Sequence, residues 1–467
     1  MLNYIWLGLV VAAVLIGGYH DLVGAQTGTL KEMTDKGFEM ARTAVMDIAL
    51  PLIGLMALWL GIMRLAERAG LIQALARALR PVMKWLFPEV PVEHPAMGSM
   101  LMNMAANVLG LSNAATPLGL RAMKDLETLN PCPGTATNAM CTFLAINTSS
   151  IQLLPVTAVA VLAVSGSMQP YAIIGSAFLA TAFSTLAGVT AVKLLEKLPG
   201  YRLPPPLKVK AGSGGSAPAA ASNEDRGAQD TARPAESGTV TSEPQAAPLN
   251  WLSIGALLLF FLFFCVLFAA ISFPEILHHP VSAAMQRQNA IVRSLNTISL
   301  LAVPFMLSFF PLYAALKRVK VYEQFVEGAK EGFQVAVTII PYLVAILVAI
   351  GLFRGAGGIE LITRWLGKWL NAIGFPVDLL PMCLMRPLSG SGTLGMFTEL
   401  VKQFGPDSLI ARMAGTVYGS TETTFYVIAV YFGSVSARRT RHAVPAGLIA
   451  DGVGIIASVM ICRMMFG

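Results

Sequence analysis

Polar residues that could bind a small solute are concentrated in four short stretches of an otherwise apolar chain. Two of them are related: NMAANVLGLSNAATPLG, from Asn103 to Gly119, and the shorter LSGSGT, from Leu388 to Thr393. One constant offset aligns a leucine, a serine and a threonine of the first with those of the second. The other two are INTSSIQ, from Ile146 to Gln152, and YGSTETT, from Tyr418 to Thr424. Each half of the chain therefore carries two polar interruptions.

Such interruptions predict a binding site within a membrane, because polar, glycine-rich backbone at membrane depth is tolerated only where it faces protein or a water-filled cavity. Half-helix N-termini suit an anionic or carbonyl-bearing solute. Unwound carbonyls and Ser, Thr and Asn oxygens suit Na⁺ or hydroxyl groups. The candidate solute- or ion-binding residues are Asn103, Asn107, Ser112, Asn113, Thr116, Asn147, Thr148, Ser149 and Gln152 in the first half, and Ser389, Ser391, Thr393, Ser420, Thr421, Glu422 and Thr423 in the second.

Close helix packing is the alternative for the glycines and serines, since small residues let membrane helices approach one another. For the LSGSGT stretch alone, packing is the preferred interpretation. For the asparagine-rich stretch we favour a lined cavity, because buried amide groups need hydrogen-bond partners.

Glu422 is the most informative single residue. A carboxylate at the middle of a membrane helix costs about 2.5 kcal/mol or more, so it is a functional candidate by default. The alternative is a structural partner for Arg386. Asp47 and Asp451 are expected nearer helix ends, where capping or an interface position explains them.

Several kinds of enzyme machinery are missing from the sequence. It contains no GxxxxGK[ST] loop, HExxH, CxxC or GxSxG motif, and its five cysteines are scattered. We therefore expect no ATP hydrolysis, no enzyme activity, no metal and no cofactor, with Na⁺ or H⁺ as a candidate coupling ion.

Composition indicates an integral membrane protein. Of 467 residues, 55% are hydrophobic and only 13% are charged, too few to cover the surface of an ordinary soluble domain. The net charge of +7 fits basic cytoplasmic loops and does not require a nucleic-acid partner.

The apolar runs predict an all-α polytopic membrane protein with about nine crossings and two re-entrant helical hairpins. The hairpins are expected at 97–123 and 379–401. The crossings are expected at 4–18, 44–63, 138–164, 172–192, 251–273, 297–316, 332–352, 410–432 and 444–461.

The chain divides into two repeats and a linker. Residues 1–200 form the first repeat, and residues 251–467 form the second, with its leading helix at 251–273. Residues 201–250 are rich in Gly, Ser, Ala, Pro, Glu and Gln, which predicts a disordered linker.

Basic clusters set the orientation of the two repeats. They follow the second and last spans of the first half, whereas in the second half they follow the first span and precede the last. Both patterns satisfy the positive-inside rule only if the halves are inverted, with each repeat holding one hairpin and one broken helix. The N-terminus and the linker are then cytoplasmic, and the C-terminus is outside.

The polar stretches resemble those of a known family. NMAANVLGLSNAATPLG and INTSSIQLLP resemble spore maturation protein A, and RPLSGSGTLG and YGSTETTFY resemble spore maturation protein B. The chain looks like a fusion of the two over nearly its whole length outside the linker. Their nucleoside-recognition or "gate" domain is similar to the core of concentrative nucleoside transporters, which implies paired hairpins in inverted repeats.

These observations favour a secondary transporter in the bacterial cytoplasmic (inner) membrane, moving a small polar or anionic solute. Its expected partners are that solute, membrane lipids and a further copy of the chain. One alternative is a membrane-embedded enzyme that uses Glu422 and Arg386 on a lipid-linked substrate. Another is a non-transporting scaffold for envelope assembly or spore maturation.

The inverted arrangement predicts the sides of the membrane on which two positions lie. A reporter fused near Ser222 is expected to lie inside the cell, and a reporter fused after Gly467 is expected to lie outside. Compartment-specific reporters fused at each position measure this directly. Detection of both on the same side would contradict the inverted repeat.

Overall fold

The computed structural model describes residues 2–23, 28–110, 112–149, 151–203, 250–274, 290–358, 361, 364 and 374–467. Within them the chain is helical, with no strand beyond one isolated bridge between Thr135 and Arg439. The N-terminal part contains α1 (Leu2–Val23), α2 (Thr29–Arg42), the π-helical turn η1 (Thr43–Ala49), α3 (Leu50–Arg68), α4 (Leu71–Leu86), α5 (Pro95–Val108), α6 (Ser112–Glu127), α7 (Asn138–Ser149), α8 (Val156–Val164) and α9 (Ile173–Leu195). The C-terminal part contains α10 (Trp251–Ser272), α13 (Ala290–Leu316), α14 (Val321–Gly355), α16 (Leu380–Met385), α17 (Gly390–Phe404), α18 (Leu409–Ser420), α19 (Thr424–Ser434) and α20 (Ala443–Phe466). Residues 204–249 of the predicted linker and most of 359–373 fall outside the described residues.

Seven segments of the described chain are long and apolar enough to cross a membrane, so the protein is a multi-pass membrane protein. They are Trp6–Val23, Thr29–Arg68, Pro170–Leu195, Trp251–Ser272, Val292–Leu316, Val321–Gly355 and Ala443–Phe466. They coincide with seven of the nine predicted crossings. The other two predicted crossings are each split into two shorter helices, α7 with α8 and α18 with α19. The total of nine remains a prediction.

The helices are interrupted at all four polar stretches. The α5–α6 turn places Gly110 at φ +77°, a left-handed conformation that glycine adopts without strain. The α7–α8 break ends at Pro155, which precedes the first turn of α8. Ser389 begins α17, where its Oγ accepts a hydrogen bond from Gly392 N at 3.0 Å. Thr421 to Thr423 separate α18 from α19. The polar sequences thus mark where regular helix ends.

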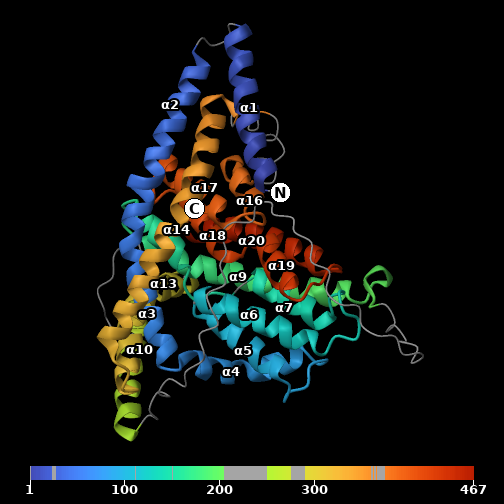
Figure 1. Cartoon of the computed structure of the whole chain (residues 1–467). Coiled ribbons are helices and arrows are strands. Elements are labelled where there is room, and N and C mark those ends of the chain that lie inside the picture. Colours follow the sequence, from blue (N-terminus) through green and yellow to red (C-terminus); the bar gives the residue numbers. More distant parts are fainter. Residues whose placement is uncertain are drawn as a thin grey trace, which may run out of the picture.

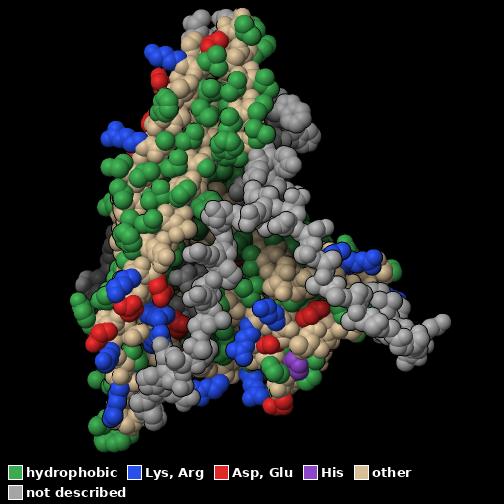
Figure 2. Space-filling model, in the orientation of Figure 1, with side chains coloured by type: hydrophobic (Ala, Val, Ile, Leu, Met, Phe, Trp, Pro, Cys, Tyr) green, Lys and Arg blue, Asp and Glu red, His purple; other side chains and the backbone are tan. Residues whose placement is uncertain are grey.

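The elements are arranged as an elongated body (Figure 1). The α1–α2 arm forms its upper end, and α4, α5 and α6 lie at its lower side. Between them lie α7, α9, α19 and α20. In Figure 2, hydrophobic side chains cover the upper arm, whereas charged side chains gather over the lower part of this face. Such a hydrophobic covering is expected of helices that face lipid rather than water.

Helices α3 and α14 approach each other backbone to backbone. A Cβ atom on Gly328 of α14 would stand 2.4 Å from Leu60 O of α3, and one on Gly332 would stand 2.6 Å from Met56 O. Small residues at such contacts let membrane helices gain packing energy without a hydrophobic driving force. This pairing joins the N-terminal and C-terminal parts of the chain.

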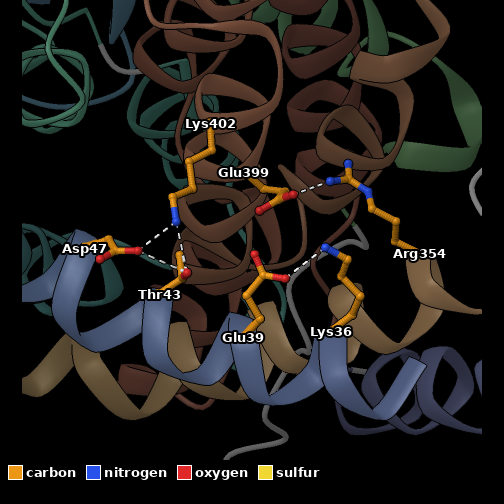
Figure 3. A network of polar contacts seen from close by, with 7 residues as sticks. All are labelled: Lys36, Glu39, Thr43, Asp47, Arg354, Glu399 and Lys402. Carbon is orange, nitrogen blue, oxygen red and sulfur yellow. Dashed lines mark hydrogen bonds and ion pairs between the residues drawn. The ribbon is translucent and has the colours of Figure 1, made fainter. Parts of the chain in front are cut away.

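Charged side chains near the π-helical turn η1 also link the two parts (Figure 3). Lys402 Nζ of α17 donates to Thr43 Oγ1 at 2.9 Å and to Asp47 Oδ2 at 2.8 Å. Nearby, Arg354 of α14 pairs with Glu399 of α17. Asp47, which was expected to cap a helix or to lie at an interface, pairs with Lys402 across the contact between the two parts. A π-turn widens the helix locally, and such turns are frequent at functional positions.

Replacing a helical glycine by alanine usually stabilises a helix, but at the α3–α14 contact we expect it to destabilise the protein. Gly332→Ala should lower the unfolding temperature in detergent, since overpacking typically costs about 1–3 kcal/mol. Gly54→Ala on α3 is the matched control: an added Cβ meets nothing within 4 Å, so higher helix propensity should stabilise by up to about 1 kcal/mol. Equal midpoints for the two variants would contradict the close approach.

Candidate functional site

A cavity of about 460 Å³ lies where the interrupted helices meet. Its polar wall is built from the α5–α6 turn and the breaks of α7–α8, α16–α17 and α18–α19. Its apolar wall comes mainly from α3. The apolar wall includes Met56, Trp59, Leu60 and Met63, and the polar wall includes Gly110, Gln152, Arg386, Gly390, Ser391, Tyr418 and Glu422. Both parts of the chain contribute to one cavity.

Glu422 and Gln152 join the two parts across this cavity. Gln152 Nε2 donates to Glu422 Oε1 at 3.0 Å. The backbone of Glu422 is fixed as well, because its N–H donates to Thr148 O at the end of α7, at 2.7 Å. The side chain of Glu422 is only partly buried, so its carboxylate can meet a solute in the cavity.

Arg386 provides the positive charge of the site and is 3% exposed. Its Nη2 donates to Tyr418 O at 3.0 Å and its Nη1 to Thr423 Oγ1 at 3.3 Å. Its guanidinium also lies over the Tyr418 ring, 5.0 Å from the centroid. Nε of Arg386 is buried without a hydrogen-bond partner. Within the described residues no ion pair joins Arg386 to Glu422. The alternative that Glu422 is a structural partner of Arg386 is therefore not supported by a direct contact.

The N-terminus of α17 faces the same cavity, through Gly390 and Ser391. Free N–H groups and the positive end of a helix dipole favour negative charge there. The sequence-predicted residues that line the cavity are therefore Gln152, Ser391 and Glu422.

The predicted asparagines instead form a hydrogen-bonded cluster beside the cavity. Asn107 Nδ2 donates to Asn147 Oδ1 at 2.9 Å, and Asn103 Nδ2 donates to Ala115 O at 2.7 Å. Tyr431 OH of α19 donates to Asn147 Oδ1 at 3.3 Å. The amides satisfy one another, and of the described residues in the stretch from Asn103 to Gly119 only Gly110 lines the cavity. The hydrogen-bond partners that these amides require are therefore protein groups, not a solute or water in a cavity.

Most of the remaining predicted residues lie behind the cavity wall. Ser149 and Thr393 are fully buried, and their hydroxyls donate to Ile146 O at 3.2 Å and Ser389 O at 2.6 Å. The buried residues of this layer are Thr148, Ser149, Ser389, Thr393, Ser420, Thr421 and Thr423. Thr116 is half-buried on α6. The side chains of Ser112 and Asn113 lie outside the described part of the structure.

Two features of the site were missed by reasoning from the sequence. Trp59, 4% exposed, lines the apolar wall, and nothing in its spacing distinguishes it from an interface tryptophan. Asp451 is 2% exposed inside α20, not at a helix end, and its Oδ2 accepts a hydrogen bond from Thr424 Oγ1 at 2.6 Å. The helical spacing of Gly447, Asp451 and Gly454 was the available signal, since it places all three on one face.

Comparison with known proteins gives the family. The Gate family model, described as nucleoside recognition, matches residues 49–195. Spore maturation protein B of Bacillus subtilis is 45% identical over 173 residues, 37% of this chain and 97% of that protein. Spore maturation protein A of the same organism is 39% identical over 189 residues, 40% of this chain and 92% of that protein. No solved structure matches the chain. Because both relatives are matched over nearly their whole length, the chain belongs to the family of spore maturation proteins A and B.

Proposed function

We propose that the protein is a secondary transporter of a small polar solute, which binds in the cavity between the four helix interruptions. The observation that carries this proposal is the shared wall: Gln152 comes from the N-terminal part, and Arg386 and Glu422 come from the C-terminal part. A site at the contact of two repeats lets one repeat move against the other and expose the solute on alternate sides.

The order and lengths of the elements support an inverted repeat. Helices α6 and α17 have 16 and 15 residues, α7 and α18 have 12 each, and α9 and α20 have 23 and 24. A short turn precedes α6 and likewise α17, and a break follows α7 and likewise α18. We infer that residues 1–200 and 251–467 are two gate-type repeats of opposite orientation, joined by a cytoplasmic linker at 201–250.

The proposed arrangement has nine crossings of the bacterial inner membrane. The broken pairs α7–α8 and α18–α19 supply the two crossings beyond the seven apolar segments. The α5–α6 pair and the α16–α17 pair act as re-entrant hairpins. In this topology the N-terminus is cytoplasmic and the C-terminus is outside.

The polar wall suits a solute with both acceptor and donor groups. Arg386 and the N-terminus of α17 favour a negative or carbonyl group. Glu422 and the Gln152 amide oxygen accept hydrogen bonds from hydroxyl or amino groups. Trp59 offers an apolar face to the remainder of the solute. The description of the Gate model as nucleoside recognition makes nucleosides the first probes to test.

Alternating access predicts that one cavity residue is reached from both sides of the membrane. Ser391→Cys, in a background whose native cysteines are replaced by serine or alanine, should react with a membrane-impermeant thiol reagent in right-side-out and in inverted vesicles. Ser458→Cys is the control, because Ser458 is fully buried between α18 and α20. Labelling of position 391 from one side only would favour a scaffold or an enzyme over a transporter.

Solute binding should depend on the cavity carboxylate. With a mixture of the common ribonucleosides as the probe, Glu422→Gln should weaken binding by about 0.5–3 kcal/mol, the range for residues within one network. Isothermal calorimetry on protein in nanodiscs measures this change. Glu327→Gln is the matched control, since Glu327 pairs with Lys330 at the exposed surface of α14. Unchanged affinity in Glu422→Gln would remove Glu422 from the site.

A further inference from the structure

We propose that Asp451, Thr148, Thr421 and Thr424 form a Na⁺ site directly behind the solute cavity. The role of the ion as the coupling ion rests on the proposed transport function. Its binding does not, because the ligands are defined by the packing of α7, α18 and α19 against α20.

One face of α20 holds these residues together. Gly447, Asp451, Gly454 and Ser458 follow one another at helical spacing on that face. A Cβ atom on Gly447 would stand 2.8 Å from Thr424 Cγ2 and 3.6 Å from Thr148 Cγ2. Two turns farther along α20, a Cβ atom on Gly454 would stand 2.7 Å from Thr421 Cγ2.

Ser458 extends this contact by one more turn of α20. Its Oγ donates to Ser420 Oγ, the last residue of α18, at 3.2 Å. Along α20, Thr148 and Thr424 therefore lie on the N-terminal side of Asp451, at Gly447. Thr421 lies on its C-terminal side, at Gly454.

Three oxygen atoms at this place are buried without a hydrogen-bond partner. They are Asp451 Oδ1, Thr148 Oγ1 and Thr421 Oγ1, on side chains that are 2%, 0% and 3% exposed. The hydrogen bond from Thr424 compensates the buried carboxylate of Asp451 only in part, and each unpaired hydroxyl adds to the desolvation cost. In the proposed site, a cation held by Asp451 Oδ1 and by these hydroxyls would give each of them a partner. It would also neutralise the carboxylate.

Two helix C-termini strengthen the preference for a cation. Thr148 lies in the last turn of α7, which ends at Ser149, and Thr421 follows the last residue of α18. The negative ends of both helix dipoles therefore lie beside the face of α20 that carries Asp451. In transporters with broken helices, such ends and the unwound backbone next to them coordinate Na⁺ or H⁺.

The charge and size of the site point to a small monovalent ion. Asp451 is its only carboxylate ligand, and the other ligands are neutral hydroxyl oxygens, whereas Ca²⁺ sites collect six to eight oxygens with several carboxylates. Arg386 and Glu422 are the charged groups that act on Asp451 from the neighbouring breaks, and their charges offset each other. The methyl groups of Thr424 and Thr421 are held by close contacts at Gly447 and Gly454, so the hydroxyl oxygens of these threonines are not free to spread around a larger cation.

The position of the site explains how the ion would act on the solute. Thr421 and Glu422 are adjacent in the same break, so an ion that fixes Thr421 also fixes the backbone of the cavity carboxylate. The N–H of Glu422 already donates to Thr148 O at 2.7 Å, which joins the ion ligands of both halves to the cavity wall.

Thermal unfolding of the purified full-length protein tests the proposal with Na⁺ itself as the probe. At constant pH and ionic strength, replacing choline chloride by NaCl should raise the unfolding temperature, because a ligand that binds only the folded state stabilises it. KCl should raise it much less. Asp451→Asn should lose the Na⁺-dependent part of the rise.

Two further variants keep the test decisive. Thr421→Val keeps the side-chain shape but removes one ligand oxygen, so the apparent Na⁺ affinity should fall by roughly tenfold or more. This variant and direct ²²Na⁺ binding to the wild-type protein decide the matter if Asp451→Asn does not fold. Asp47→Asn is the matched control and should keep the full response, since Asp47 is half-exposed and pairs with Lys402.

The proposal is overturned if NaCl and KCl act alike on the wild-type protein, if Asp451→Asn keeps the Na⁺ response, or if pH alone produces the shift. These readouts need no transported solute. A preserved Na⁺ response together with one-sided labelling of Ser391→Cys would refute transport and leave the ion site standing. Two-sided labelling without a Na⁺ response would refute the ion site and leave transport standing.

Discussion

The arrangement depends on the cost of leaving backbone groups unpaired inside a membrane. Four helices are interrupted, and each interruption survives only where other parts of the protein or a cavity satisfy the exposed groups. The hydrogen bond from Glu422 N to Thr148 O, 2.7 Å long, shows how this is done, because one break of each half supplies the partner of the other. The breaks therefore have to meet, and their meeting point creates both the cavity and the layer of buried hydroxyls behind it.

Polar residues near the breaks fall into groups with different physical roles. The amides of Asn103, Asn107 and Asn147 are paired with one another and with Tyr431, which fixes the α5–α6 pair against α7 and α19. Glu422 and Arg386 face the cavity and keep part of their hydrogen-bonding capacity free. Asp451 lies deeper and has an unpaired oxygen. Only the last two groups can respond to a ligand, and for this reason they carry the proposed solute and ion sites.

Much of the helical organisation could be predicted from the sequence, because long apolar runs and polar interruptions are strong local signals. Seven predicted crossings coincide with apolar helical segments, and all four polar stretches are helix interruptions. The family resemblance, carried by the same motifs, was also confirmed. The inversion of the two repeats stays a prediction, because it follows from how basic clusters distribute between the two sides of a membrane.

The contacts that individual side chains make in the folded protein could not be predicted. Sequence showed that the asparagines needed partners, but only the fold shows that they find them in Tyr431 and in one another rather than in a solute. Asp451 was expected near a helix end, although the predicted crossing at 444–461 already places it inside the span; the structure buries it where α7, α18 and α19 pack against α20. Which group is left unpaired is a property of tertiary packing, and no local pattern encodes it.

If helix interruptions from both halves form one solute site, a bound solute should be visible between them. The most direct measurement is a high-resolution electron cryo-microscopy map of the protein in lipid nanodiscs with the ribonucleoside mixture present. We expect density for a bound solute between Arg386 and Glu422, against Trp59, and we expect this density to disappear in Glu422→Gln. A map in which the breaks are separated, or in which apolar side chains fill the space between them, would contradict it.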